Sequence, residues 1–260
     1  NGVNRYPDPR QGELKKMISS IKGVPCERIF AANGSDEAID LLYRIFCEPG
    51  RDNAVAISPS YGMYGVAAAI NNVEFREVLL REDFSLDADA LLAATDGDTK
   101  LVFLCSPNNP AGNITERSEI EKIARNFGGI LVIDEAYIDF SPSTTFLPKL
   151  EDYPNIVVLQ TLSKAWGMAG LRIGFAFASE SIISVMSKVK YPYNIGEDTL
   201  QRAVGFLQNS PEKRIKTIVE ERQRLACQLE MLPEVVKVYP SEANFLLVKF
   251  LDSHQIYNKL

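Results

Sequence analysis

Histidine is nearly absent from this chain of 260 residues, since His254 near the C-terminal end is the only one. Catalytic triads usually need a histidine, and many metal sites use several. The sequence therefore disfavours both kinds of site, and we expect no metal ligand set. Proton transfer in any active site must then fall to lysine, tyrosine or carboxylate side chains.

Cysteine is scarce as well, because the chain has four cysteines that lie far apart and form no Cys-x-x-Cys pair. Cys47 and Cys105 stand in apolar surroundings, which is typical of core thiols. This usage indicates a reducing compartment, and therefore the cytoplasm, rather than a disulfide framework.

Several signatures of other protein classes are missing. No Gly-Lys pair occurs, which excludes a P-loop, and no Gly-x-Gly-x-x-Gly motif supports dinucleotide binding. No apolar run approaches the roughly 18 residues of a membrane span, and we expect no signal peptide. The net charge is −6 and no basic stripe is present. The sequence therefore disfavours membrane and nucleic-acid partners.

Short apolar runs alternate with helical patterns through most of the chain. The runs do not alternate between apolar and polar residues, which indicates strands that are buried on both faces of a largely parallel sheet. We therefore predict an α/β fold, in which helices cover both faces of a mostly parallel sheet in three layers. The predicted strands are 29–32, 54–57, 74–80, 101–105, 130–133, 156–159 and 173–178, and the predicted helices are 12–21, 35–46, 61–70, 87–94 and 115–127.

The pattern changes near residue 192, and we predict three parts. Residues 1–24 form an N-terminal arm and helix, 25–192 a large ligand-binding domain, and 193–260 the start of a small α+β domain. The third part has helical patterns at 198–207 and 211–232 and possible strands at 235–238 and 245–248. We expect this small domain to be incomplete at the last residue.

The segment 161–172 follows a buried strand and offers a hydroxyl, an amine, small residues and a guanidinium. This set suits a ligand that carries both an aldehyde and a phosphate. Lys164 could form a Schiff base with the aldehyde, while Ser163 and Arg172 bind the phosphate. The alternative is a loop with two solvated cations, and the segment alone does not decide between them.

Other strands end in polar or aromatic residues at the edge where ligands of such sheets bind. Residues 34–37 form either an anion site at a helix start or an ordinary cap at Ser35. Tyr61 could lie flat on a planar ligand or fill the core. The segment 106–113 is a proline-stiffened loop that presents asparagine. The segment 134–137 also fits the metal-binding strand of ATPases, which the missing Gly-Lys pair excludes.

Six segments together resemble one known family: RYPDP, NGSDEAI, SPSYGMY, SPNNPAGN, VIDEAYIDF and TLSKAWGMAGLRIG. The chain resembles the fold-type I aminotransferases that depend on pyridoxal 5′-phosphate (PLP), and within them the histidinol-phosphate aminotransferases. The segments occur in the family's order and span nearly the whole chain. The resemblance implies PLP as cofactor and a PLP-binding large domain.

The resemblance also implies catalytic roles for Lys164, Asp134 and Tyr137. Lys164 matches the lysine that holds the cofactor as a Schiff base and then moves the substrate's α-proton. Asp134 matches the carboxylate that keeps the pyridine nitrogen protonated. Such a pair at about 4 Å contributes about 4 kcal/mol at an effective dielectric near 20, or about three pKa units. Asn109 and Tyr137 match the two groups that hydrogen-bond the ring hydroxyl.

The other implied contacts surround the cofactor phosphate and the substrate. Tyr61 matches the stacking aromatic, and Tyr6 matches a tyrosine that reaches the phosphate of the neighbouring subunit, so that a homodimer is expected. The implied phosphate cup consists of Gly34, Ser35, Asp36, Glu37, Ser163 and Arg172. The expected substrate contacts are Asn109, Tyr6 and Asn194.

The implied reaction moves an amino group between histidinol phosphate and 2-oxoglutarate in L-histidine biosynthesis, so the expected partners are small amino and 2-oxo acids. Two departures leave the substrate open: no arginine lies beyond Arg224, and Gln160 stands where relatives often have arginine. An aromatic aminotransferase and a threonine-phosphate decarboxylase of the same family remain alternatives. A regulatory domain that binds PLP without turnover is an alternative of another class.

Overall fold

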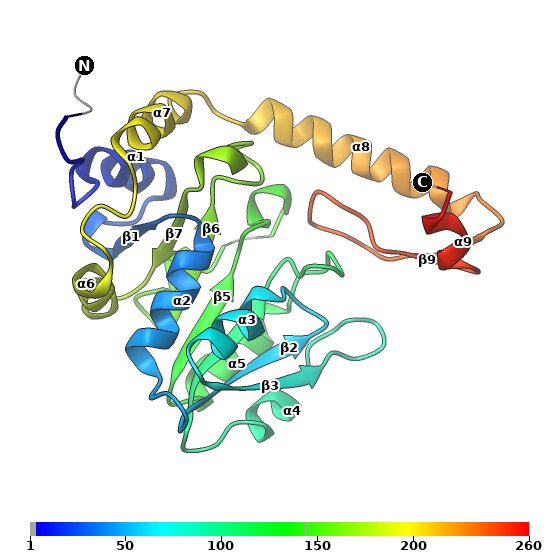
Figure 1. The fold of residues 1–260 in the computed structure, drawn as a ribbon. Helices are drawn as coiled ribbons and strands as arrows, with labels where there is room; N and C mark the ends of the chain where they lie inside the picture. The colour runs from blue at the N-terminus through cyan, green and yellow to red at the C-terminus, as the bar shows by residue number, and fades with distance from the viewer. Residues whose placement is uncertain (1–3, 144, 260) are drawn as a thin grey trace.

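A computed structural model describes residues 4–143 and 145–259 of the chain. Its centre is a seven-stranded sheet with helices on both faces (Figure 1). The strands are β1 (Ile29–Ala32), β2 (Asn53–Ser58), β3 (Glu74–Leu79), β4 (Thr99–Cys105), β5 (Ile130–Asp134), β6 (Ile156–Thr161) and β7 (Gly174–Phe177), in the spatial order β1-β7-β6-β5-β4-β2-β3. The predicted three-layer α/β fold with a mostly parallel sheet is confirmed.

Two buried apolar clusters, one on each face of the sheet, make up the core. The helices α1 (Gly12–Lys22), α4 (Ala88–Ala93), α5 (Arg117–Asn126) and α7 (Glu197–Leu207) contribute to the first cluster. The helices α2 (Ser35–Phe46), α3 (Met63–Ile70) and α6 (Glu180–Val189) contribute to the second. In β4, Val102 and Leu104 point into the first cluster, while Phe103 and Cys105 point into the second. Burial on both faces explains the unbroken apolar runs of the sequence.

Strand β7 runs antiparallel to both of its neighbours, β1 and β6. Its first residue therefore lies at the edge of the sheet where the other strands end. Arg172, which precedes β7, is brought to that edge by this reversal. Gly174 opens β7, and a Cβ there would lie 2.3 Å from the backbone nitrogen of Ser35. Glycine thus allows the start of α2 to pack directly against β7.

Two local predictions were wrong. The N-cap of α2 is Gly34, and Ser35 is the first helical residue. The backbone of Gly34 has φ of 77°, which glycine adopts without steric cost, and Ser35 is thereby freed from capping. The second strand of the C-terminal pair is Val248–Phe250 rather than 245–248, because Phe245 packs against the core instead of pairing in a sheet.

The C-terminal segment (residues 208–259) extends away from the sheet in Figure 1. It contains α8 (Glu212–Glu230), the antiparallel pair β8 (Val235–Val238) and β9 (Val248–Phe250), and α9 (Ser253–Tyr257). No residue of α8 is buried. Arg214 ties α8 to the rest of the chain by donating to the carbonyl of Trp166 at 3.0 Å. The predicted division at residues 24 and 192 stays a prediction.

Within the residues that the structure describes, no helix combines the length and the apolar character needed to cross a membrane.

Candidate active site

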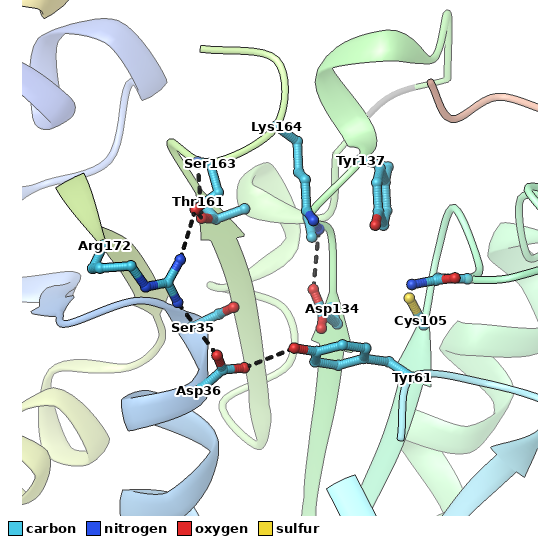
Figure 2. Close-up of a pocket in the computed structure, with 12 residues that line it drawn as sticks. Ser35, Asp36, Tyr61, Cys105, Asp134, Tyr137, Thr161, Ser163, Lys164 and Arg172 are labelled. Carbon is cyan, nitrogen blue, oxygen red and sulfur yellow. Dashed lines mark hydrogen bonds and ion pairs between the residues drawn. The ribbon is translucent and has the colours of Figure 1, made fainter. Parts of the chain in front are cut away.

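A pocket opens at the edge of the sheet where the parallel strands end. Figure 2 shows its side chains converging from separate elements. The lining residues are Ser35, Asp36, Tyr61, Cys105, Asn109, Asp134, Ala136, Tyr137, Thr161, Ser163, Lys164 and Arg172. The structure therefore brings most of the predicted cofactor residues together.

Asp134, the last residue of β5, supplies a buried negative charge to the pocket, since it is only 3% exposed. Its Oδ1 accepts a hydrogen bond from the backbone nitrogen of Ala136 at 3.0 Å, and its Oδ2 accepts one from the hydroxyl of Tyr64 at 2.8 Å. Burial raises the pKa of Asp134 to about 6, although these two hydrogen bonds and the charge of Lys164 act in the opposite direction. The carboxyl group is therefore ionised at neutral pH and can pair with a cationic ligand atom.

Lys164 reaches the same pocket from the turn that follows β6. Its Nζ lies 5.3 Å from the ring centroid of Tyr137. Among the residues that the structure describes, no carboxylate lies within salt-bridge distance of this amine. An amine that faces a cavity without a fixed ionic partner is suited to form a covalent bond with a carbonyl ligand.

The pocket side opposite Tyr137 is built to bind an anion. Ser35 stands in the first turn of α2, where backbone N–H groups have no helical partner. The Nη1 of Arg172 lies 3.5 Å from the hydroxyl of Ser163, and its Nη2 lies 3.4 Å from Asp36 (Figure 2). A Cβ at Gly34 would lie 2.6 Å from that Nη2. The glycine is thus needed for the guanidinium to rest against the start of the helix, in an arrangement suited to phosphate oxygens.

Two tyrosines and an asparagine provide the remaining polar groups of the pocket. Tyr61 donates its hydroxyl to Oδ1 of Asp36 at 3.1 Å. Tyr137 is 7% exposed, and burial raises the pKa of its phenol to about 12, so that it remains a hydrogen-bond donor at neutral pH. Asn109 lines the pocket from the loop that follows β4. These groups can orient a flat ligand that carries a hydroxyl.

Three lining residues, Cys105, Ala136 and Thr161, were not predicted from the sequence, and two of them end strands. Cys105 ends β4, and burial raises the pKa of its thiol well above the usual range, so that it stays protonated. Thr161 ends β6, and its hydroxyl accepts a hydrogen bond from the backbone nitrogen of Ser163 at 3.1 Å. Both are the last residues of predicted or observed strands, and the same strand-end reasoning that identified Asp134 could have found them.

Two predicted site residues, Asn194 and Glu37, form a hydrogen-bonded cluster outside the pocket lining. Asn194 donates to the carbonyl of Ala31 at 3.1 Å and to Glu37 at 2.9 Å. Its side-chain oxygen accepts from Gln11 at 2.8 Å. Glu37 also accepts a hydrogen bond from the backbone nitrogen of Asn33. The observed contacts thus connect the N-terminal arm, the segment before α7 and the start of α2, and the substrate role of Asn194 stays a prediction.

Tyr6 lies on the surface and does not line the pocket of its own chain. Its side chain is 80% exposed, and its ring stacks on Tyr193 with a centroid distance of 4.5 Å and an interplanar angle of 10°. An exposed and preformed pair of aromatic rings is available to a second molecule.

Gln160, the residue that stands where relatives often have arginine, lies in the core beside a buried carboxylate. Its Nε2 donates to Glu135 at 2.8 Å, and the backbone nitrogen of Phe146 donates to the same carboxylate at 2.7 Å. Burial raises the pKa of Glu135. Neither Gln160 nor Glu135 lines the pocket, so their pairing stabilises the protein interior.

An exposed lysine, a buried carboxylate and a guanidinium beside a helix start line one pocket at the strand ends of a three-layer α/β fold, an arrangement that suits a phosphate-bearing carbonyl ligand. The family model described as "Aminotransferase class I and II" matches residues 1–260, and the chain belongs to this family. It is 57% identical over 259 residues to the histidinol-phosphate aminotransferase of Bacteroides thetaiotaomicron, covering 99% of this chain and 75% of the relative. It is 49% identical to the protein of the same name from Flavobacterium johnsoniae, covering 100% and 75%.

Solved structures show the same fold. The histidinol-phosphate aminotransferase from Clostridium acetobutylicum superposes with a TM-score of 0.90 at 24% identity, over 99% of this chain and 78% of that chain. The enzyme of the same name from Sinorhizobium meliloti, determined in complex with pyridoxal-5′-phosphate, gives a TM-score of 0.86 at 24% identity, over 98% and 71%.

Proposed function

We propose that this protein uses PLP to transfer an amino group from histidinol phosphate to 2-oxoglutarate, forming imidazole acetol phosphate and glutamate in L-histidine biosynthesis. The observation that carries this proposal is the convergence of Lys164, Asp134 and Arg172 on one pocket, in a chain that is 57% identical to a histidinol-phosphate aminotransferase. The pocket fits the cofactor because it offers an amine, a buried carboxylate and an anion cup within one cavity.

Each polar group of the cofactor finds a complementary side chain. Arg172, Ser163 and the start of α2 suit the phosphate, and Asp134 suits the protonated ring nitrogen. Asn109 and Tyr137 suit the ring hydroxyl. When bound, PLP supplies the carbonyl that receives the amino group and a ring that accepts the electron pair left by the departing α-proton.

Lys164 has two tasks in this reaction. Its amine would hold the aldehyde carbon of the cofactor, and its Nζ would take the substrate's α-proton and return it. The exposed, unpaired position of Lys164 leaves its side chain free to move between these tasks. The ring of Tyr137 limits that movement on one side.

Asp134 stabilises positive charge on the cofactor ring. An ion pair at about 4 Å in a site with an effective dielectric near 20 is worth about 4 kcal/mol. The carboxylate is already oriented by its hydrogen bonds from Ala136 and Tyr64, so that little reorganisation is needed when the ring binds.

The substrate assignment is tested by steady-state assays of the PLP-loaded protein with three amino donors: histidinol phosphate, phenylalanine and threonine phosphate. We expect the highest kcat/KM for histidinol phosphate with 2-oxoglutarate as acceptor. Preference for phenylalanine would indicate an aromatic aminotransferase, and release of carbon dioxide from threonine phosphate would indicate a decarboxylase. Either result would overturn the assignment.

The alternative of a non-catalytic PLP-binding domain is tested by adding glutamate alone. An aminotransferase must complete a half-reaction with glutamate, and this changes the absorption spectrum of the bound cofactor. Lys164→Ala must abolish the change, whereas Lys188→Ala, which alters an exposed lysine on α6, must preserve it. An unchanged spectrum in the unaltered protein would favour the non-catalytic alternative.

We also propose a homodimer in which Tyr6 of one subunit completes the phosphate site of the other. The support is the exposure of Tyr6, which does not line the pocket of its own chain. Mixing the two inactive variants Lys164→Ala and Tyr6→Ala tests this directly. In a hybrid dimer, one site has both an intact Lys164 and an intact Tyr6, so that activity must reappear on mixing. A mixture no more active than its two components, or a fully active monomer in sedimentation, would refute shared sites.

We further propose that the enzyme works in the cytoplasm. The described cysteines Cys26, Cys47, Cys105 and Cys227 are all free thiols, a state that a reducing compartment maintains. Thiol titration of protein purified from the native organism, without added reductant, must find free cysteines. Quantitative disulfide formation would contradict this placement.

A further inference from the structure

Tyr64 forms a hydrogen bond with the carboxylate of Asp134, although Tyr64 does not line the pocket itself. Its hydroxyl donates to Oδ2 of Asp134 at 2.8 Å, and both residues are buried, with exposed fractions of 1% and 3%. The backbone nitrogen of Ala136 binds the other oxygen at 3.0 Å. Each carboxylate oxygen thus has one protein donor and keeps acceptor capacity for a ligand in the pocket.

A stack of aromatic rings fixes the position of Tyr64. Its ring lies over Phe103 of β4 with a centroid distance of 4.8 Å and an interplanar angle of 16°. Tyr43 of α2 stacks on Phe103 at 5.4 Å, and its hydroxyl donates to the backbone carbonyl of Tyr64 at 3.0 Å. Tyr61, a residue of the pocket, meets the ring of Tyr64 edge-on at 5.7 Å. Tyr64 is therefore held by α2, α3 and the sheet together.

The hydroxyl of Tyr64 is what distinguishes this residue from a core aromatic. A phenylalanine at position 64 would keep the stack on Phe103, so packing alone does not require a tyrosine. A buried hydroxyl without a partner is costly, and a buried carboxylate is costlier still unless hydrogen bonds compensate it. The hydrogen bond between Tyr64 and Asp134 gives a partner to both the buried hydroxyl and the buried carboxylate.

The same contact affects the charge of the carboxylate. Burial raises the pKa of Asp134, and the hydrogen bond from Tyr64 acts against that rise because it favours the ionised form. The pKa of Tyr64 itself is raised well above its usual range by burial and by Asp134, so that its proton stays on the phenol. The other titratable groups that face Asp134 are Asp36, Tyr61, Cys105, Tyr137 and Lys164.

We infer that Tyr64 is a positioning residue, which holds Asp134 oriented and ionised for the positively charged ring of the cofactor. The inference rests on the proposed function, because it concerns how the site binds PLP. Tyr64 acts through Asp134 and makes no contact with the pocket space of its own.

The test compares Tyr64→Phe with Tyr153→Phe, which removes the hydroxyl of a buried tyrosine in the apolar cluster on the other face of the sheet. The hydroxyl of Tyr153 accepts a hydrogen bond from Arg125 at 2.7 Å and does not bond Asp134, so that this variant controls for general loss of a buried hydroxyl. The dissociation constant of PLP from each apoprotein is measured between pH 5 and pH 8. Thermal unfolding of the apoproteins confirms that each variant is folded.

We expect Tyr64→Phe to weaken PLP binding roughly tenfold to a hundredfold at neutral pH, the usual effect of losing a hydrogen bond to a charged group. Binding must also fall off at a higher pH than in the unaltered protein, because Asp134 is protonated more readily. Tyr153→Phe must bind PLP within about twofold of the unaltered protein, with an unchanged pH profile, because the Tyr64–Asp134 contact is retained.

A double variant separates action through Asp134 from a general effect on packing. In the background of Asp134→Asn, adding Tyr64→Phe must weaken PLP binding by less than about twofold, since the charge that Tyr64 supports is gone. Equal losses in the two tyrosine variants, or an undiminished loss in the Asp134→Asn background, would overturn the inference. Failure of the unaltered protein to bind PLP would instead overturn the proposed function.

Discussion

The edge of the sheet around the pocket and the C-terminal segment (residues 208–259) use charge and apolar surface in opposite ways. At the pocket edge, the carboxylates of Asp134 and Glu135 are 3% and 2% exposed, and protein donors satisfy both. In the C-terminal segment, every charged side chain of α8 except that of Arg222 is exposed, and Met231 and Tyr257 are 76% and 81% exposed.

The difference shows where the fold restricts its side chains. Asp134 and Glu135 are each held by neighbours on other elements, so that the position of Asp134 in the pocket is set before a ligand arrives. The C-terminal segment is held to the large sheet by contacts such as that of Arg214 with the carbonyl of Trp166 and that of Phe245 with Tyr137. We therefore expect equivalent substitutions in the two regions to have very different effects.

The largest contrast is expected between Asp134→Asn and Asp252→Asn. Both replace a carboxylate by an amide, but Asp252 only caps α9, where its side chain accepts from the backbone nitrogen of Gln255 at 2.9 Å. Asparagine caps a helix about as well as aspartate. We expect kcat/KM to fall roughly 10³-fold in Asp134→Asn, as loss of about 4 kcal/mol implies, and to stay within about twofold in Asp252→Asn. Similar losses in both variants would remove the contrast between the regions.

The second effect concerns how the stability of the apoprotein depends on pH. The pKa of Asp134 is raised from 3.8 to about 6, so that the folded state binds this proton more tightly than the unfolded chain does. The stability contributed by the protonated group is fully present below pH 3.8 and is lost as the pH rises through 6.

The free energy of unfolding of Asp134→Asn, measured relative to the unaltered apoprotein, must therefore rise by about 2 kcal/mol between pH 4 and pH 7. Urea denaturation at a series of pH values provides the measurement, with Asp252→Asn as the control that shows no such trend. A flat difference would mean that burial does not raise the pKa of Asp134.

A smaller effect is expected from arginine substitutions. Arg172→Ala must weaken PLP binding about tenfold, since the guanidinium, whose side chain is 50% exposed, loses only part of a charged hydrogen bond's usual contribution. Arg224→Ala removes a guanidinium from the exposed face of α8, where it pairs with Glu221, and must leave PLP affinity unchanged. Equilibrium titration of the apoproteins with PLP distinguishes the two, and equal affinities would place the anion cup elsewhere.

The smallest effect is expected at the contact between the pocket and the C-terminal segment. The rings of Tyr137 and Phe245 meet edge-on at 5.2 Å and 90°. Phe245→Leu keeps apolar bulk but removes this pair, and must lower the free energy of unfolding by about 1 kcal/mol. Tyr257→Leu, at a side chain that is 81% exposed, must leave it unchanged within the error of urea denaturation. An unchanged free energy of unfolding in Phe245→Leu would mean that the contact between the C-terminal segment and Tyr137 does not stabilise the protein.

The meeting of these residues in one pocket could be predicted from the sequence, because it depends on backbone topology. Parallel strands that end at one edge bring together the residues that follow them, and this principle sufficed for Asp134 and Lys164. Arg172 was predicted from the residue types of the segment 161–172 and then from the family resemblance, because it precedes its strand and reaches the edge only through the reversal of β7. That reversal is not visible in an apolar run of four residues.

Contacts between side chains from distant elements were beyond the reach of the sequence. Tyr64 lies in an apolar helix, and its sequence pattern is that of a core residue. The carboxylate that accepts its hydrogen bond lies 70 positions further along the chain, so the sequence pattern does not reveal the contact. Asn194 was assigned to the substrate from its neighbours in sequence, whereas its observed hydrogen bonds go to Ala31 and Glu37. Hydrogen bonds of this kind depend on packing between elements, which periodicity does not encode.

The central claim is that one amine at the end of β6 captures the carbonyl of PLP. Reducing the PLP-loaded protein with borohydride fixes the cofactor to its lysine, and peptide mass spectrometry then identifies that residue. We predict that the label lies on Lys164, and that it disappears in Lys164→Ala. A label that resides on another lysine, or that is spread over exposed lysines such as Lys188, would contradict the account.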